Sequence, residues 1–244
     1  MDLKIKDVAE LLHVSETTIR RWLSDGKIPA YRLNHQYRFS RIEIENWMMS
    51  CKLDQGRSFI DGEEVQIYPS LDPVDDQETI KSSGTQQYSL YRAINKGDVF
   101  LDVDGETKEE VIRSTLSKVA PSLGFDVEVV AELFLDRERL MPTALNNGLA
   151  VPHSRDFILK DSVSDRVVVV FPKAPIEYGA LDGVPVHTLF FLFSSNDKKH
   201  LHLLAKIAHF SSYAPSMQKL FQKPSKEGFL EFVKAWEGRI RPSS

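Results

Sequence analysis

Apolar residues near the N-terminus recur at the spacing of a helix. Residues 4–14 and 16–25 each place apolar side chains three and four positions apart, which lines up one face of a helix for burial. Ser15 stands where an N-cap for the second helix is expected, and Gly26 stands just past its end. The pattern therefore predicts two short helices joined by a tight turn.

The next residues change to a strand-like pattern. IPAYRL and YRFS flank the polar turn NHQ, which predicts a small β-hairpin. Ser40 and Glu43 then form an S-x-x-E capping box ahead of a third helix over residues 41–50. Two helices, a hairpin and a further helix are the parts of a small winged helix-turn-helix domain.

From residue 88 onward, helical and strand-like patterns alternate. This arrangement predicts an α/β (α+β) domain with a mixed sheet flanked by helices. Strands are expected over residues 99–103, 148–154, 166–172 and 186–193. Helices are expected over residues 108–123, 126–140, 198–212, 215–223 and 226–236.

An acidic stretch separates the two patterned parts. Residues 58–88 hold one Lys and seven acids, a net charge of −6, together with several prolines, serines and glycines. That composition predicts a linker with little regular structure, although an irregular loop packed on one of the domains is the alternative. The predicted organisation is a helix-turn-helix domain over 1–57, an acidic linker over 58–87 and an α/β domain over 88–244.

Composition narrows the class of protein. Of 244 residues 42% are hydrophobic, which is enough for buried cores. The single cysteine, Cys51, excludes an intramolecular disulfide and a cysteine-based metal site. The charged N-terminus does not fit a signal peptide, and the apolar runs VVVVF and TLFFLF are far shorter than the ~20 residues of a membrane helix. We expect a soluble, cytoplasmic protein without a membrane span.

The predicted helix-turn-helix carries candidate DNA contacts. Residues 1–57 hold ten Lys/Arg and eight Asp/Glu, a net charge of +2, which is modest for a DNA-binding domain. One such small domain binds weakly, so a homodimer is expected. A protein-docking role for the same fold stays open. The candidates are Thr17, Thr18, Arg20 and Arg21 on the second helix, and Arg32 and Arg38 on the hairpin.

Chemistry in the second domain points to histidine. The chain has no H-E-x-x-H spacing, no P-loop and no G-x-S-x-G elbow, so no metal and no cofactor is expected. What remains is an imidazole acting as a nucleophile, because its neutral form can attack phosphorus. The stretch NNGLAVPHSRDF brings His153 to the end of a predicted strand, where a bound partner could reach it at a shallow surface.

Two resemblances sharpen these expectations. The run VSETTIRRWLSDGKIPAYRL…YRFSRIEIENWM resembles DNA-binding domains of the excisionase and MerR type. LDRERLMPTALNNGLAVPHSRDF and PIEYGALDGVPVHTLFFLFSSNDKKHLHLLAKIA resemble the enzyme IIA domain of the fructose, mannitol and nitrogen-regulatory type from the bacterial phosphotransferase system. The second resemblance implies that an HPr-like phosphocarrier phosphorylates His153, assisted by Arg137 and His200. It also implies that Thr143 and Asn147 belong to a phosphate loop.

The same resemblance shows where the chain departs from the family. Met141, Ala144 and Asn146 stand where three loop glycines are usual, and Ser154 follows His153 in place of a glycine. Glycines in such a loop let backbone N–H groups approach a phosphate.

Three functions follow as hypotheses. The leading one is a nitrogen-regulatory IIA protein, a phosphohistidine carrier with a mainly regulatory role, which controls transcription or partner proteins through its DNA-binding domain. The second is a phosphocarrier that passes phosphate to a separate sugar permease subunit. The third, motivated by the missing glycines, is a binding protein that is not phosphorylated.

Overall fold

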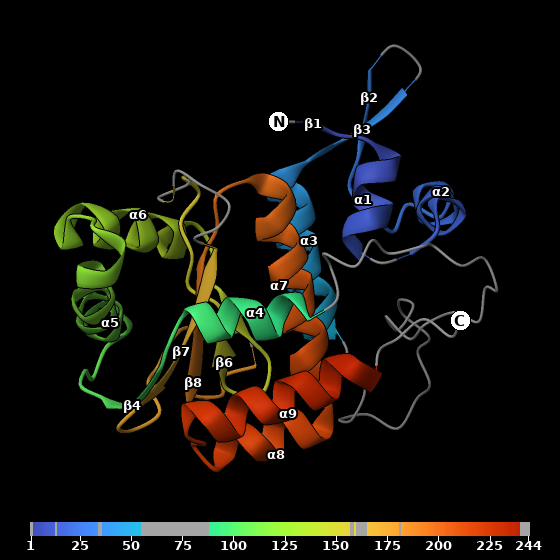
Figure 1. The fold of residues 1–244 in the computed structure, drawn as a ribbon. Helices are drawn as coiled ribbons and strands as arrows, with labels where there is room; N and C mark the ends of the chain where they lie inside the picture. Colours follow the sequence, from blue (N-terminus) through green and yellow to red (C-terminus); the bar gives the residue numbers. More distant parts are fainter. Residues whose placement is uncertain are drawn as a thin grey trace. The chain divides into compact units, whose positions relative to one another are not determined.

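The chain divides into two compact units, Met1–Lys81 and Ser82–Ser243 (Figure 1). The computed structural model describes residues 2–12, 14–33, 36–54, 88–156, 159, 165–180 and 182–239. The predicted acidic linker lies outside the described residues, so it stays a prediction, as do the domain boundaries set by it.

The first unit begins with the two predicted helices, α1 Ile5–Leu12 and α2 Glu16–Ser24. Ser15 caps α2, because its Oγ accepts a hydrogen bond from the backbone N–H of Thr18 at 3.1 Å. Gly26 follows the helix with φ of 66°, a left-handed conformation that glycine adopts without strain. Both helix-end predictions are therefore confirmed.

The predicted hairpin and third helix complete this unit. Strands β2 Tyr31–Leu33 and β3 Gln36–Ser40 pair antiparallel, and β1 Asp2–Leu3 joins the other edge of β3. Helix α3 spans Arg41–Asp54. Trp22 is buried, and the half-buried Trp47 packs against it with ring centroids 5.7 Å apart. The turn Asn34–His35 lies outside the described residues.

The second unit is built on a five-stranded mixed sheet, which confirms the predicted class. Its strand order is β4-β7-β8-β6-β5, with parallel pairs β4/β7 and β6/β8 and antiparallel pairs β7/β8 and β5/β6. The strands are β4 Val99–Val103, β5 Ala144–Leu145, β6 Leu149–Ala150, β7 Arg166–Pro172 and β8 Thr188–Phe193.

Six described helices flank this sheet (Figure 1). They are α4 Ser89–Lys96, α5 Lys108–Leu123, α6 Val127–Leu140, α7 Asp197–Ser212, α8 Ala214–Phe221 and α9 Lys226–Arg239. Five of them were predicted from helical periodicity, and α5 begins where Thr107 Oγ1 accepts from Glu110 N at 3.2 Å. Helix α4 and the two-residue strands β1 and β5 were not predicted.

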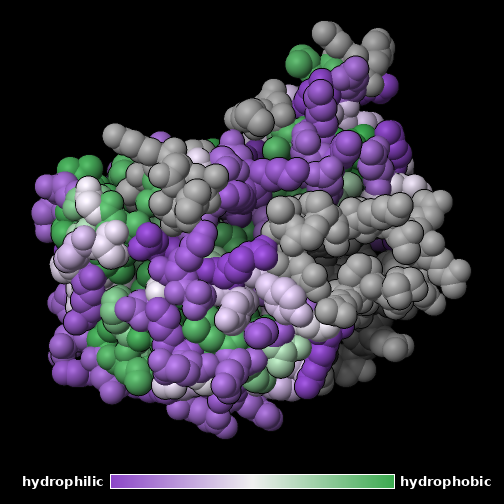
Figure 2. All heavy atoms as spheres, viewed as in Figure 1, coloured by the Kyte–Doolittle hydropathy of each residue, from purple (hydrophilic) through white to green (hydrophobic). Residues whose placement is uncertain are grey.

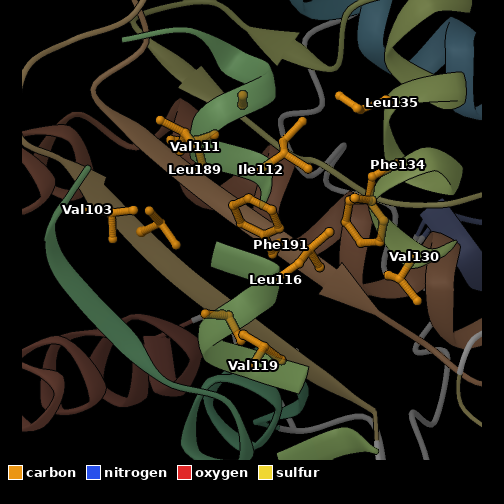
Figure 3. Packing of buried hydrophobic residues seen from close by; sticks show 14 of the residues in the cluster. Val103, Val111, Ile112, Leu116, Val119, Val130, Phe134, Leu135, Leu189 and Phe191 are labelled. Atoms are coloured by element: carbon orange, nitrogen blue, oxygen red, sulfur yellow. The ribbon is translucent and has the colours of Figure 1, made fainter. Parts of the chain in front are cut away.

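Both faces of the sheet are covered, which explains the uninterrupted apolar run of β8. Phe191 lies 5.9 Å from the ring of Phe134 on α6, whereas Phe190 lies 6.2 Å from Phe210 on α7. Successive side chains of a strand point to opposite faces, so a strand buried on both faces is apolar at every position. Figure 3 shows the core on the α5–α6 side, where Val111, Ile112 and Leu116 lie beside Phe191.

Polar side chains cover most of the face in Figure 2, and hydrophobic side chains show in smaller patches. Among the helices that the structure describes, none has the length and apolar character to cross a membrane.

Candidate functional site

His153 is held in the sheet although β6 itself is only two residues long. Leu149 lies beside Thr188 of β8, and His153 forms a parallel bridge with Leu192, so the same register continues past β6. The backbone N–H of Leu192 donates to the carbonyl of Pro152 at 3.0 Å. Proline has no N–H to donate, yet its carbonyl fixes the backbone just before His153.

One hydrogen bond defines the tautomer of His153. Its Nδ1 lies 2.7 Å from the carbonyl oxygen of Val151. A carbonyl oxygen can only accept, so Nδ1 carries the proton and donates it. In the neutral ring the lone pair is then on Nε2, and this nitrogen is the nucleophilic atom.

His200 lies against His153. It is the fourth residue of α7, and the centroids of the two imidazole rings are 4.8 Å apart at an interplanar angle of 65°. Ser194 Oγ lies 3.1 Å from His200 Nδ1. The sequence predicted that these two histidines meet, and the structure brings them together.

The imidazole of His153 turns back onto the carbonyl of its own strand and packs on His200. Its accessibility to a protein partner stays a prediction.

Arg137 binds the segment that leads into β5. Its Nη1 donates to the carbonyl of Met141 at 2.8 Å. The N–H of Val151 donates to the carbonyl of Thr143 at 3.0 Å, so this segment runs beside the residues that precede His153. Arg137 therefore lies toward the same end of the β5–β6 pair as His153.

The arrangement of β5 and β6 does not support the predicted role of Thr143 in a phosphate loop. Thr143 is fully buried; its N–H donates to Glu138 Oε2 at 2.9 Å and its hydroxyl donates to Glu138 Oε1. The hydroxyl of Tyr178 donates to the same carboxylate at 3.0 Å, and burial raises the pKa of Tyr178 well above its usual value. Thr143 instead joins β5 to the end of α6.

Glu138 and Tyr178 were missed as members of this cluster. Glu138 directly follows Arg137 in the L-x-R-E segment, which is the signal that could have drawn attention to it. Tyr178 comes from a distant loop, and no local pattern indicates its position.

Asn147 is also misplaced by the prediction. It lies at the tip of the β5–β6 hairpin with φ of 67°, where its N–H donates to Asp182 Oδ2 at 2.8 Å. His187 Nε2 donates to its carbonyl at 3.1 Å. Five residues separate Asn147 from His153, and β6 lies among them, so Asn147 and His153 lie beyond opposite ends of this strand.

These features agree with a match over most of the second unit. Residues 92–236 match the family described as phosphoenolpyruvate-dependent sugar phosphotransferase system, EIIA 2. The chain belongs to this EIIA family. Residues 3–52 match a helix-turn-helix domain, in agreement with the first unit.

Relatives of this EIIA chain include regulatory proteins. A nitrogen regulatory protein of Pseudomonas aeruginosa is 32% identical over 147 residues, which cover 59% of this chain and 94% of that protein. One of Klebsiella oxytoca is 28% identical over 146 residues, covering 59% of this chain and 89% of that protein.

Solved structures share the fold. The nitrogen regulatory protein IIA-Ntr of Neisseria meningitidis has a TM-score of 0.53 at 23% identity and covers 59% of this chain and 97% of that chain. A putative phosphotransferase-system IIA domain of Streptococcus pyogenes has a TM-score of 0.51 at 17% identity and covers 60% and 95%. At such identities the likeness concerns the fold alone.

The helix-turn-helix unit exposes most of its predicted DNA contacts. Thr17, Arg20 and Arg21 are exposed on α2, and Arg32 is exposed on β2. Thr18 was expected on the same exposed face, but it is 6% exposed. The correction has a local cause, because Thr18 turns inward to the N-cap, where its Oγ1 lies 3.0 Å from Ser15 Oγ.

The second hairpin arginine, Arg38, is partly engaged within the hairpin. Its guanidinium donates to the carbonyl of Tyr37 at 3.1 Å and to Gln36 Oε1 at 2.6 Å. Arg32 lies 5.9 Å from the ring centroid of Tyr37. Both arginines remain candidates for phosphate contacts at this hairpin.

Proposed function

We propose that this EIIA-family chain is a nitrogen-regulatory IIA protein that accepts a phosphoryl group on His153 from an HPr-like phosphocarrier. The observation that carries the proposal is the hydrogen bond from His153 Nδ1 to the carbonyl of Val151. It fixes the proton on the nitrogen that does not react and leaves the lone pair on Nε2. Resemblance to nitrogen regulatory proteins and the helix-turn-helix unit favour regulation over transport.

The transfer follows from this tautomer. His153 Nε2 attacks the phosphorus of the donor's phosphohistidine, and a new nitrogen–phosphorus bond forms. The donor's own nitrogen–phosphorus bond breaks, and its electron pair stays on the donor imidazole. As the new bond forms, positive charge develops on the His153 ring. The hydrogen bond from Nδ1–H to the carbonyl of Val151 stabilises this charge.

Arg137 and His200 supply the electrostatics of the proposed site. The phosphoryl oxygens carry negative charge, which a guanidinium and an imidazole N–H stabilise.

A phosphotransfer assay tests the proposal. The full chain is incubated with a phosphorylated HPr-like donor, and label transfer is measured. The wild type should be labelled, and His153→Ala should lose the label. His209→Gln is the matched control, because His209 is an exposed histidine of α7 that contacts Trp236 rather than the site. Label that persists in His153→Ala would contradict the assignment.

A second function, that of a binding protein which is not phosphorylated, is favoured by one observation. Met141, Ala144 and Asn146 stand where loop glycines are usual, and glycines there let backbone N–H groups approach a phosphate. The same assay separates the two functions, since an unlabelled wild type beside a control IIA protein labelled by the same donor leaves only the binding role.

A further inference from the structure

Ser194 contacts the second histidine of the site. It directly follows β8, only two residues beyond the bridge between Leu192 and His153. Its side chain is 6% exposed, and its Oγ lies 3.1 Å from His200 Nδ1. A buried hydroxyl at this distance is a hydrogen-bond partner of the imidazole.

The surrounding loop holds both ends of this hydrogen bond in place. Asp165 Oδ1 accepts from the N–H of Ser195 at 2.7 Å, and its Oδ2 lies 2.6 Å from Lys199 Nζ. Asn196 Oδ1 accepts from the N–H of Lys199 at 3.0 Å and so caps α7. Ser194 and His200 therefore lie at the two ends of one fixed connection, which leads from β8 into the first turn of α7.

We infer that Ser194 is a positioning residue, which donates its hydroxyl proton to His200 Nδ1 and so keeps His200 as the Nε2–H tautomer. A neutral imidazole carries one proton, so a ring that accepts at Nδ1 donates at Nε2. The role of this tautomer in phosphotransfer rests on the function proposed for His153. No sequence motif singled out Ser194.

The chemistry of the pair favours this direction of the hydrogen bond. One ring nitrogen of His200 lies within 4.8 Å of one of His153. His153 presents its lone pair at Nε2, and the phosphoryl oxygens that would arrive there are acceptors only. A second lone pair from His200 would repel them, whereas an N–H donor stabilises their charge.

The tautomer can be read directly in the full chain by nitrogen NMR of ¹⁵N-labelled histidine. Wild-type His200 should show a protonated Nε2 and an unprotonated Nδ1. Ser194→Ala should increase the population of the Nδ1–H tautomer, and Ser194→Thr, which keeps the hydroxyl, should restore the wild-type signature. Ser195→Ala is the matched control. It removes a hydroxyl that contacts Asn196 and keeps the backbone N–H of residue 195, which donates to Asp165.

Phosphotransfer gives a second readout. Ser194→Ala should lower the maximal rate about fivefold, the effect of losing one hydrogen bond of ~1 kcal/mol, with KM for the phosphorylated donor unchanged. Ser194→Thr should recover the rate, and Ser195→Ala should keep it.

The outcomes separate the inference from the proposed function. An Nδ1–H tautomer in the wild type, or a signature unchanged in Ser194→Ala, would overturn the role of Ser194. If the wild type shows the Nε2–H tautomer, controlled by Ser194, yet accepts no phosphoryl group, the positioning role stands and the phosphoacceptor function fails.

Discussion

At the scale of single residues, Gly148 limits what the hairpin before His153 tolerates. Its φ is +73°, and a Cβ at this position would lie 2.6 Å from His187 Cδ2 and 2.8 Å from the carbonyl oxygen of Pro185. Gly148→Ala should therefore lower the free energy of unfolding by about 2–4 kcal/mol, through backbone strain and overpacking together. Urea denaturation measures this change.

Gly183 provides a matched control for this prediction. Its φ is +68°, but nothing lies within 4 Å of the added Cβ, so Gly183→Ala adds the backbone strain alone. Its cost should be about 1 kcal/mol. Equal costs at Gly148 and Gly183 would show that the close approach to His187 is not a constraint.

His187 should make stability depend on pH. Burial lowers its pKa, and the hydrogen bond to the carbonyl of Asn147 opposes this only in part. The unfolded chain therefore binds a proton at His187 before the folded chain does, so stability falls as pH drops below about 6.5 and stops falling below the folded pKa. Urea denaturation across this range measures the slope.

His187→Gln should remove this contribution, because an amide does not titrate in this range and its N–H₂ group can still donate to Asn147. His209→Gln is the control, since His209 is exposed. A slope that is the same in wild type and His187→Gln would contradict the assignment to His187.

At the scale of elements, α4 depends on a charge from the far end of the unit. Its N-cap residue, Tyr88, makes no side-chain capping bond. Glu237 of α9 takes this role, because its carboxylate accepts from the N–H groups of Leu90 and Tyr91 at 3.2 and 2.8 Å. The same carboxylate lies 3.1 Å from Lys206 Nζ.

Glu237→Ala should lower the free energy of unfolding by about 3–5 kcal/mol, since it leaves a buried ammonium and two helix N–H groups without this partner. Glu231→Ala, at an exposed position of the same helix, should change it by less than about 0.5 kcal/mol. Amide hydrogen exchange should show earlier loss of protection in α4 for Glu237→Ala. Undiminished protection there would exclude the capping role.

The same remote capping explains why α4 could not be predicted, whereas α5 could. Thr107, directly before α5, is its N-cap, and the helix then runs for 16 residues with a buried face. Helix α4 has 8 residues, and its capping group is 146 residues away in the sequence. Local patterns predict elements that are long and locally capped, and they miss elements stabilised from a distance.

The candidate site divides in the same way. His153 and His200 were predicted as a pair, and they are neighbours. Thr143 and Asn147 lie only four residues apart, yet the register of β5 on β6 sends them toward opposite ends of the hairpin. Register is set by pairing across the sheet, which a linear motif does not contain.

At the scale of the whole molecule, the chain joins a helix-turn-helix unit to an EIIA unit. The helix-turn-helix fold of the first unit predicts that it binds DNA. Arg20 and Arg21 are exposed on α2, and the contact of Arg20 with Glu16 at 3.7 Å is a solvent-exposed pair of small strength. Both arginines are therefore available to phosphates. Random duplex DNA at low salt should bind the wild type, because phosphate contacts do not depend on sequence.

Arg20→Ala with Arg21→Ala should weaken this binding and reduce the slope of log K against log salt by about 1 for each phosphate that the variant no longer neutralises. Lys234→Ala is the control, since it removes a positive charge from the EIIA unit and should leave the slope unchanged. Labelling of His153 by the phosphorylated donor should stay at the wild-type level in the double variant, because the substituted arginines belong to the other unit. If the wild type shows no affinity for duplex DNA at low salt, the first unit is a protein-docking module, and regulation by this chain must act through a protein partner.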